Sequence, residues 1–169
     1  MPAKIGGIAV LHDMLVKLYS LEEKPELYRK LKEIGISVKR AMPVDKGHIV
    51  LFVRNNFGDG PANECSYSFT GHPVNCFIAV REKRIIGFAC YNTVAKDFFG
   101  PIGVYEKYRG MGVGEALLRA GLLALKNSGF AYAIVSSTEE TEGFYRKTVG
   151  ATIIEDSFPG VYQNMISVD

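Results

Sequence analysis

The sequence has almost no excess charge of either sign and no long apolar run. Its 20 lysines and arginines against 18 aspartates and glutamates give a net charge of +2, which is too small to indicate a nucleic acid or a membrane surface as partner. No segment approaches the ~20 consecutive apolar residues that cross a bilayer. We therefore expect neither a nucleic-acid partner nor a membrane partner.

Cysteine is also scarce. The chain has three cysteines, Cys65, Cys76 and Cys90, spread along the sequence. They form no C-x-x-C pair and have no histidine at metal-ligand spacing, so we expect no metal site. The first residues lack the small-residue cleavage site of a secretory signal. These absences favour a reduced chain in the cytoplasm.

What the sequence does contain is the pattern of one mixed domain. Its 169 residues, 47% of them hydrophobic, suffice to bury about 70% of the surface of the unfolded chain. Apolar spacing and turn residues predict strands at 14–19, 36–40, 74–80, 84–92, 98–104, 131–137, 151–158 and 161–168, and helices at 21–35, from Pro43 onward, at 58–69, from the glycines near 112 to about 126, and at 139–149. This order predicts an α/β (mixed α+β) fold whose sheet is antiparallel early, has strand-helix-strand crossovers later, and is covered by helices on both faces.

The strand predicted at Phe98 to Val104 has an unusual composition, because it contains Gly100, Pro101 and Gly103. Proline cannot donate to a neighbouring strand, and glycine is common at bulges. We therefore expect this strand to be irregular or bent.

Three glycines, Gly110, Gly112 and Gly114, precede the most apolar helix of the chain. The first turn of a helix has unpaired amides and the positive end of the helix dipole, and glycines let a phosphate approach these amides closely. A P-loop is excluded because Glu115 and Ala116 follow the last glycine, and neither frame of G-x-G-x-x-G fits. The pattern predicts a phosphate-binding loop of another kind.

The pattern that fits is R-x-x-G-x-G, with Arg109, Gly112 and Gly114 in the fixed places, within "VYEKYRGMGVGEALL". A second motif, "EGFYRKTVGA", spans Glu142 to Ala151. Together they resemble the GNAT superfamily of N-acetyltransferases. The resemblance implies a GNAT-like domain at 36–169, with a central mixed, mostly antiparallel sheet and a bulged, splayed strand. Residues 1–35 would then be a strand-helix extension in front of it.

The resemblance also implies a role for individual residues. An acetyl-coenzyme A cosubstrate would be held by the backbone of Ile102, Gly103, Val104, Arg109, Gly110, Met111, Gly112, Val113 and Gly114. The amide of Val104 would face the thioester oxygen, where a preorganised donor stabilises developing negative charge. Tyr145 would be the acid that protonates the departing sulfur. The acetyl group would pass directly to an amine of a small molecule or peptide in a ternary complex.

The sequence leaves the base open. The family often has a glutamate near the start of the bent strand, where this chain has Phe98 and Phe99. Glu64, His72, Asp97, Glu106 and a chain of water molecules are all candidates. Relatives also carry an asparagine seven positions before the tyrosine, where this chain has Thr138, so that contact to the cofactor arm is in question.

Other functions remain open at this stage. The chain could be a non-catalytic acetyl-coenzyme A-binding module that regulates a partner, or Cys90 could carry the acyl group covalently. The acceptor pocket is expected between Pro43 and Gly71, where Phe57, Tyr67 and Phe69 could either line it or belong to the core. The N-terminal extension could pair with a second copy and form a homodimer.

Overall fold

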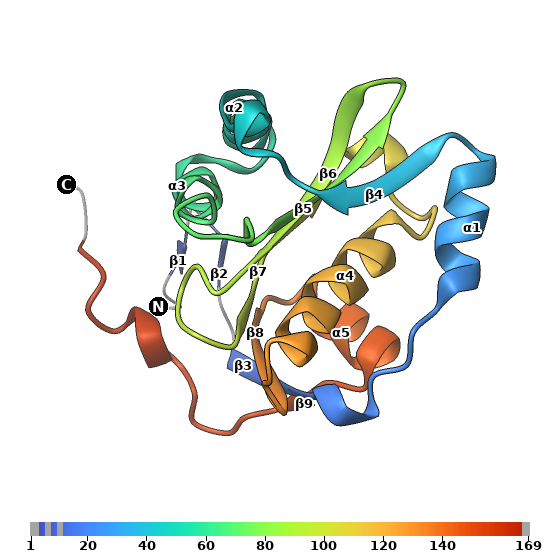
Figure 1. The fold of residues 1–169 in the computed structure, drawn as a ribbon. Helices are drawn as coiled ribbons and strands as arrows, with labels where there is room; N and C mark the ends of the chain where they lie inside the picture. Colours follow the sequence, from blue (N-terminus) through green and yellow to red (C-terminus); the bar gives the residue numbers. More distant parts are fainter. Residues whose placement is uncertain (1–3, 6–7, 10–11, 167–169) are drawn as a thin grey trace.

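One seven-stranded sheet organises the molecule, in the order β4-β5-β6-β7-β8-β3-β9 (Figure 1). The computed structural model describes residues 4–5, 8–9 and 12–166. Neighbouring strands are antiparallel except β7 and β8, which are parallel. The strands of this sheet are β3 (His12–Lys17), β4 (Ile36–Arg40), β5 (Cys76–Arg81), β6 (Arg84–Tyr91), β7 (Phe98–Val104), β8 (Tyr132–Ser137) and β9 (Thr152–Ile153). Two short strands, β1 (Lys4–Ile5) and β2 (Ile8–Ala9), pair with each other. The predicted mixed, mostly antiparallel sheet is confirmed.

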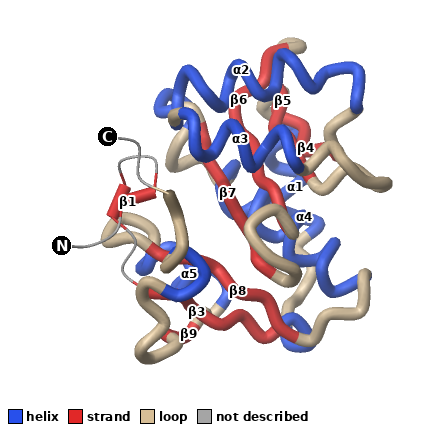
Figure 2. Tube along the Cα trace, turned by 90° about the vertical axis from the view of Figure 1, so that its left-hand side faces the viewer, coloured by secondary structure: helices blue, strands red, loops and turns tan. Residues whose placement is uncertain are grey.

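Helices cover both faces of the sheet, as predicted. They are α1 (Pro25–Glu33), α2 (Lys46–Phe57), α3 (Asp59–Tyr67), α4 (Val113–Asn127) and α5 (Glu142–Val149). Figures 1 and 2 show α2 and α3 together on one face, and α1 and α4 on the other. Each face has its own buried cluster, the first including Val53 and Phe88 and the second including Leu31 and Leu117. Tyr145 of α5 belongs to the second cluster.

Helix α4 is buried along most of its length, as its apolar sequence predicted. Even its charged residue Arg119 is only 4% exposed. Its guanidinium donates to Glu115 Oε1 at 2.8 Å, to the Glu22 carbonyl at 2.9 Å and to the Thr148 carbonyl at 3.0 Å. The three acceptors lie in the loop before α1, at the start of α4 and at the end of α5. Arg119 therefore holds these three segments together.

Strand β7 is bent, as its glycines and proline predicted. Its pairing with β6 shifts register between Ala89 and Tyr91. On its other side, β7 pairs with β8 through Phe98↔Ile134 and Phe99↔Val135. Because this pairing ends at Phe99, the rest of β7 has an open edge beside β8, which is the splayed geometry expected for the fold.

Strand β3, which lies in the segment expected in front of the domain, is part of the seven-stranded sheet. Strand β3 pairs with β8 along its whole length, from His12↔Ser137 to Lys17↔Tyr132, and with β9 on its other side. Met14 and Val16 are fully buried. A division at residue 35 therefore does not separate two packed units within the described residues, since alternating apolar residues place β3 between two strands of the predicted domain.

The predicted C-terminal strands differ most from the structure. The strand expected at 151–158 is reduced to β9, and that expected at 161–168 is absent from its described part, where Gly160–Tyr162 forms a short 3₁₀ helix, η4. Beyond β9, the Asp13 amide donates to Ser157 Oγ at 2.8 Å. The Ile154 amide still donates to the Asp13 carbonyl at 2.9 Å. The Ser157 hydroxyl takes the other half of this rung, since it also donates to the Ile154 carbonyl at 2.6 Å, and the ladder ends there. Residues 167 and 168 lie outside the described residues.

Across the described part of the chain, no helix is both long and apolar enough to cross a membrane.

Candidate active site

The open edge of β7 presents main-chain polar groups to the gap beside β8. The Tyr105 amide donates to the Ile86 carbonyl at 2.8 Å, and Val104 lies opposite Gly87. In an antiparallel ladder this makes Gly87 and Val104 a non-hydrogen-bonded pair, whose amides and carbonyls point away from the partner strand. The amide and carbonyl of Val104 therefore face β8, as do those of Ile102 two residues earlier.

A cavity of about 800 Å³ lies along this edge. It is lined by most of the site residues that the sequence predicts, namely Ile102, Gly103, Val104, Arg109, Gly110, Gly112, Gly114 and Tyr145. The side chain of Met111 is exposed and that of Val113 is buried in the core, so these two can contribute only through their main-chain atoms. The geometry thus gathers the predicted residues around one space.

The glycine loop leaves a run of amides without protein partners. The first backbone bond at the start of α4 runs from the Ala116 amide to the Gly112 carbonyl, at 3.0 Å. Within the described residues, the amides from Gly110 to Glu115 form no hydrogen bond. Gly110 and Gly112 have φ of +77° and +90°, a region that glycine enters at little cost. These N–H groups and the positive end of the α4 dipole are available to an anion.

Arg109 connects the loop to β7. Its Nε donates to the Val104 carbonyl at 3.1 Å, and its own amide donates to the Glu106 carbonyl at 3.1 Å. The free run of amides therefore begins one residue later than the motif, at Gly110. The arginine side chain fixes the distance between the two backbone segments that line the cavity.

Tyr145 lines the cavity from α5. The residue is 4% exposed, and burial raises the pKa of its hydroxyl well above the ordinary value of 10. The hydroxyl forms no hydrogen bond with the part of the chain that the structure describes. Tyr145 therefore stays protonated at neutral pH and has a proton to donate into the cavity.

The structure distinguishes between the candidate bases. Glu64 of α3 lines the cavity, whereas His72, Asp97 and Glu106 do not. Burial raises the pKa of Glu64 from its ordinary value of 4.5 to about 7. A carboxyl group with this pKa is present in both protonation states near neutral pH, which suits a proton acceptor.

Several cavity residues were not predicted. Phe57, left undecided by the sequence, packs directly on Gly103, where an added Cβ atom would lie 2.5 Å from the ring. A glycine inside a strand often marks such a close approach, so Gly103 was the available signal. Ser136 and Tyr162 also line the cavity, and no local pattern pointed to them.

The expected acceptor region contributes in part. Phe57, Pro61 and Glu64 line the cavity, whereas Tyr67 is 58% exposed and does not. Phe69 packs against the core cluster of α2 and α3. The end of α2 and one side of α3 therefore form one wall of the cavity.

Thr138 lines the cavity but already has a partner. Its Oγ1 lies 3.0 Å from Thr141 Oγ1, and its amide donates to the same oxygen at 2.8 Å. The hydroxyl pair thus occupies the place for which the resemblance implies an asparagine.

Lys24 and Lys147 supply positive charge to the cavity wall.

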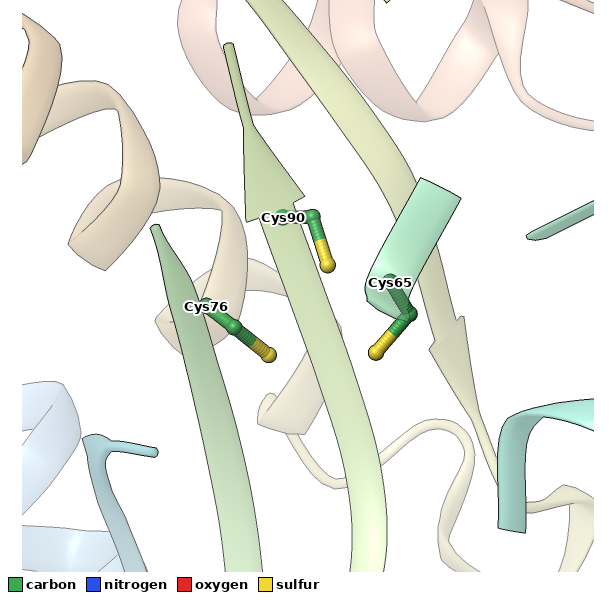
Figure 3. Close-up of side chains that lie close together, drawn as sticks. All are labelled: Cys65, Cys76 and Cys90. Carbon is green, nitrogen blue, oxygen red and sulfur yellow. The ribbon is translucent and has the colours of Figure 1, made fainter. Parts of the chain in front are cut away.

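The three cysteines converge away from this cavity, on the face covered by α2 and α3. Figure 3 shows the side chains of Cys65, Cys76 and Cys90 pointing toward one another, with all three sulfur atoms within 4.8 Å. All three are fully buried. Cys90 does not line the cavity, so the alternative in which it carries the acyl group is contradicted. Sequence spacing missed the cluster because its members come from α3, β5 and β6.

Comparison with known proteins agrees with this geometry. Residues 72–148 match the family described as acetyltransferase (GNAT) domain. Curated proteins give no match. Among solved structures, a fungal GCN5-related glucosamine N-acetyltransferase region superposes with a TM-score of 0.68 and 16% identity, over 86% of this chain and 20% of that one. A GCN5-related N-acetyltransferase from Sphaerobacter thermophilus gives 0.64 and 20%, over 88% and 50%.

An aminoglycoside acetyltransferase from an uncultured soil metagenomic sample gives a TM-score of 0.50 and 17% identity, over 69% of this chain and 88% of that one. The chain spans a fifth of the length of the fungal protein and half of the length of the Sphaerobacter thermophilus protein. At such identities the likeness shows the fold. The family match contains both the glycine loop and Tyr145, and it confirms the predicted resemblance: residues 72–148 form a GNAT acetyltransferase domain within a chain that has the GNAT fold.

Proposed function

We propose that this chain transfers the acetyl group of acetyl-coenzyme A to an amine of a small molecule or peptide, by direct attack in a ternary complex. One observation carries the proposal. A single cavity joins the free amides of the glycine loop, the open edge of β7, the hydroxyl of Tyr145 and the carboxyl group of Glu64. Anion binding, amide pairing and proton transfer therefore have suitable groups within one space.

The glycine loop and β7 would hold the cosubstrate. The amides from Gly110 onward and the charge of Lys147 suit a diphosphate. The outward-facing polar groups of Ile102 and Val104 suit the amides of an extended pantetheine arm, which would lie along β7 like an added strand. The Val104 amide would then donate to the thioester oxygen, where such a donor contributes about 3 to 4 kcal/mol to the reaction barrier.

Glu64 and Tyr145 would move the protons. Acetyl-coenzyme A supplies a thioester whose carbonyl carbon forms a bond to the amine nitrogen while the bond to sulfur breaks. Amines like that of lysine have a pKa of about 10.4, so almost all are protonated at pH 7. Glu64 would accept the proton that the amine loses, and Tyr145 would donate its own to the sulfur.

The acceptor is proposed from the charge of the cavity and from the relatives. Glu64 and Glu140 both line it and would attract an ammonium group. Two structures with a similar fold are described as acting on glucosamine and on aminoglycosides. Amino sugars and other small amines are therefore the first acceptors to test, followed by peptides.

Calorimetry and a thiol-release assay test the proposal. The purified chain should release heat on mixing with coenzyme A, and it should release free thiol from acetyl-coenzyme A in the presence of at least one member of a panel of amino sugars, polyamines and peptides. Absence of coenzyme A binding would overturn the proposal. Binding without turnover over the whole panel would favour the non-catalytic regulatory module instead.

A further inference from the structure

The three-cysteine cluster has no role in acetyl transfer, and it stands apart from the proposed function. The chain has three cysteines in 169 residues, and all of them meet at one point. Cys76 and Cys90 lie directly opposite each other on β5 and β6, and Cys65 reaches them from α3 (Figure 3). A buried cysteine by itself is a small apolar residue, but convergence from separate elements creates a set of ligands.

The distances suit one ion between the three sulfur atoms. A metal-sulfur bond is about 2.3 Å long, so three sulfurs bound to one central atom are at most about 4 Å apart, the value for a planar arrangement. The three sulfurs lie within 4.8 Å of one another. Shifts of less than about 1 Å in side chains would therefore close the site around a central atom.

The ligand set selects a soft, three-coordinate ion. Thiolates disfavour hard cations such as magnesium and calcium. Structural zinc sites use four ligands, and among the described residues the group of candidate ligands contains only these three sulfurs. Because the site has three sulfurs and no fourth ligand, the remaining candidates are ions that are stable with three ligands, chiefly monovalent copper and trivalent arsenic.

The surroundings decide between these two. The cluster is packed among apolar side chains such as Val53, Val74 and Phe88. A monovalent copper ion with three thiolates has a net charge of −2, and burying uncompensated charge is costly. Trivalent arsenic with three thiolates has no net charge.

We infer that Cys65, Cys76 and Cys90 form a binding site for one trivalent arsenic atom, or a metalloid of the same chemistry. The reaction is a condensation of arsenious acid, As(OH)₃, with three thiols. Three As–S bonds replace three As–O bonds, and each thiol proton leaves with a hydroxide as water. No oxidation state changes, so no oxidant or reductant is needed. Because the thiols are fully buried, binding requires a local opening of α3 and is slow.

The experiment uses the full, reduced chain and sodium arsenite in a buffer free of thiol reductants. Native mass spectrometry should detect one arsenic atom per chain, and X-ray absorption should detect three sulfur neighbours around it. The unfolding midpoint should rise by about 5 to 10 °C when free arsenite exceeds its dissociation constant 100-fold. Binding to the folded chain is thereby distinguished from capture by the unfolded chain.

Matched variants locate the site. Cys65→Ala, Cys76→Ala and Cys90→Ala should each weaken arsenite binding by more than the about 10- to 100-fold that loss of an outer-shell partner costs. Val74→Ala removes a buried apolar side chain from the same cluster and should keep wild-type arsenite affinity despite lower stability. The X-ray absorption measurement on wild type needs no variant, so misfolding of a cysteine variant does not block the test.

Three results would overturn the inference. The wild-type chain could fail to bind arsenite while folded, the arsenic atom could have two sulfur neighbours, or monovalent copper could bind with the same cysteine dependence while arsenite does not. The last result would show that charge in the apolar cluster does not govern the choice of ion. None of these readouts depends on acetyl transfer.

Discussion

The two ends of the cavity are built from different parts of the polypeptide. At the glycine loop and β7, the groups that face the cavity are main-chain amides and carbonyls, exposed because Gly110 and Gly112 adopt left-handed conformations and because β7 diverges from β8. Elsewhere in the cavity they are the side chains of Glu64 from α3 and Tyr145 from α5. Backbone groups suit a cosubstrate that every member of a family shares, whereas side chains can set proton transfer and the acceptor. Variants at the two ends should therefore separate cosubstrate binding from turnover.

Tyr145→Phe should have the largest effect. The change removes one hydroxyl and keeps the buried ring, so turnover should fall by about 10²- to 10⁴-fold, the range for a general acid. Coenzyme A affinity measured by calorimetry should change little, because most of the proposed contacts are with the main chain of β7 and of the glycine loop. Tyr162→Phe, which removes the other tyrosine hydroxyl at the cavity, serves as the comparison. A greater loss in Tyr162→Phe would transfer the acid role to that residue.

Glu64→Gln should come next. Loss of the base should lower kcat/KM by about 100-fold. In the wild type, kcat/KM should rise with pH as Glu64 deprotonates around its pKa of about 7, and this rise should disappear in the variant. Glu140→Gln is the comparison for the pH dependence, because Glu140 also lines the cavity but is exposed; this variant should keep the rise of kcat/KM with pH. A rise around pH 7 that persists in Glu64→Gln would assign the base to water or another group.

Gly112→Ala should act on the opposite end. Its φ is +90°, and an added Cβ would lie 3.0 Å from Leu27 Cδ1. A left-handed conformation costs a non-glycine residue about 1 to 2 kcal/mol, so coenzyme A should bind about 10-fold more weakly if the loop relaxes.

Gly129→Ala provides the control for that change. Gly129 has φ of +96° and open space around it, at the far end of α4. It should lose similar stability in thermal unfolding but keep its coenzyme A affinity. Equal affinity losses in the two variants would show that general destabilisation, and not the loop, sets binding.

The smallest effect should be the change in the free energy of unfolding with pH that Glu64 causes. The pKa of Glu64 is higher in the folded chain than its ordinary value of 4.5, so its contribution to stability is complete below pH 4.5 and is lost as pH rises through about 7. Because Glu64 is only half-buried, solvent screening limits this loss to about 1 kcal/mol. Denaturant unfolding at pH 5 and pH 8 should show the decrease, and Glu64→Gln should abolish it. The same pH dependence in both chains would contradict the raised pKa.

The backbone geometry of the glycine loop and of β7 could be predicted from the sequence because its information is local. Arg109, Gly112 and Gly114 lie within six positions, and glycine itself reports the backbone conformation that the loop requires. The bend of β7 was equally visible in Gly100, Pro101 and Gly103. The conformation of the loop and the bend of β7 are determined by the main chain of these residues themselves, so no knowledge of distant contacts was needed.

The other end could not be predicted in the same way. Glu64 was one of several equivalent acidic or basic candidates, and its burial against the cavity depends on how α3 packs. The strand expected at 151–158 is shortened for a similar reason, since Ser157 binds the Asp13 amide from far along the chain. The cysteines converge through three separate elements. These features depend on tertiary packing, which apolar periodicity does not encode.

The position of β3 has a consequence for how the protein is made. This strand begins at His12, yet its partner Ser137 lies 125 positions further along. Long-range pairing of this kind must wait until a large loop has closed, which slows folding. Strand β3 emerges from the ribosome long before β8 is synthesised. In that interval Met14 and Val16 have no sheet to cover them. The nascent chain therefore exposes an aggregation-prone apolar segment through most of its synthesis. The yield of folded protein should depend on chaperones that bind such early segments.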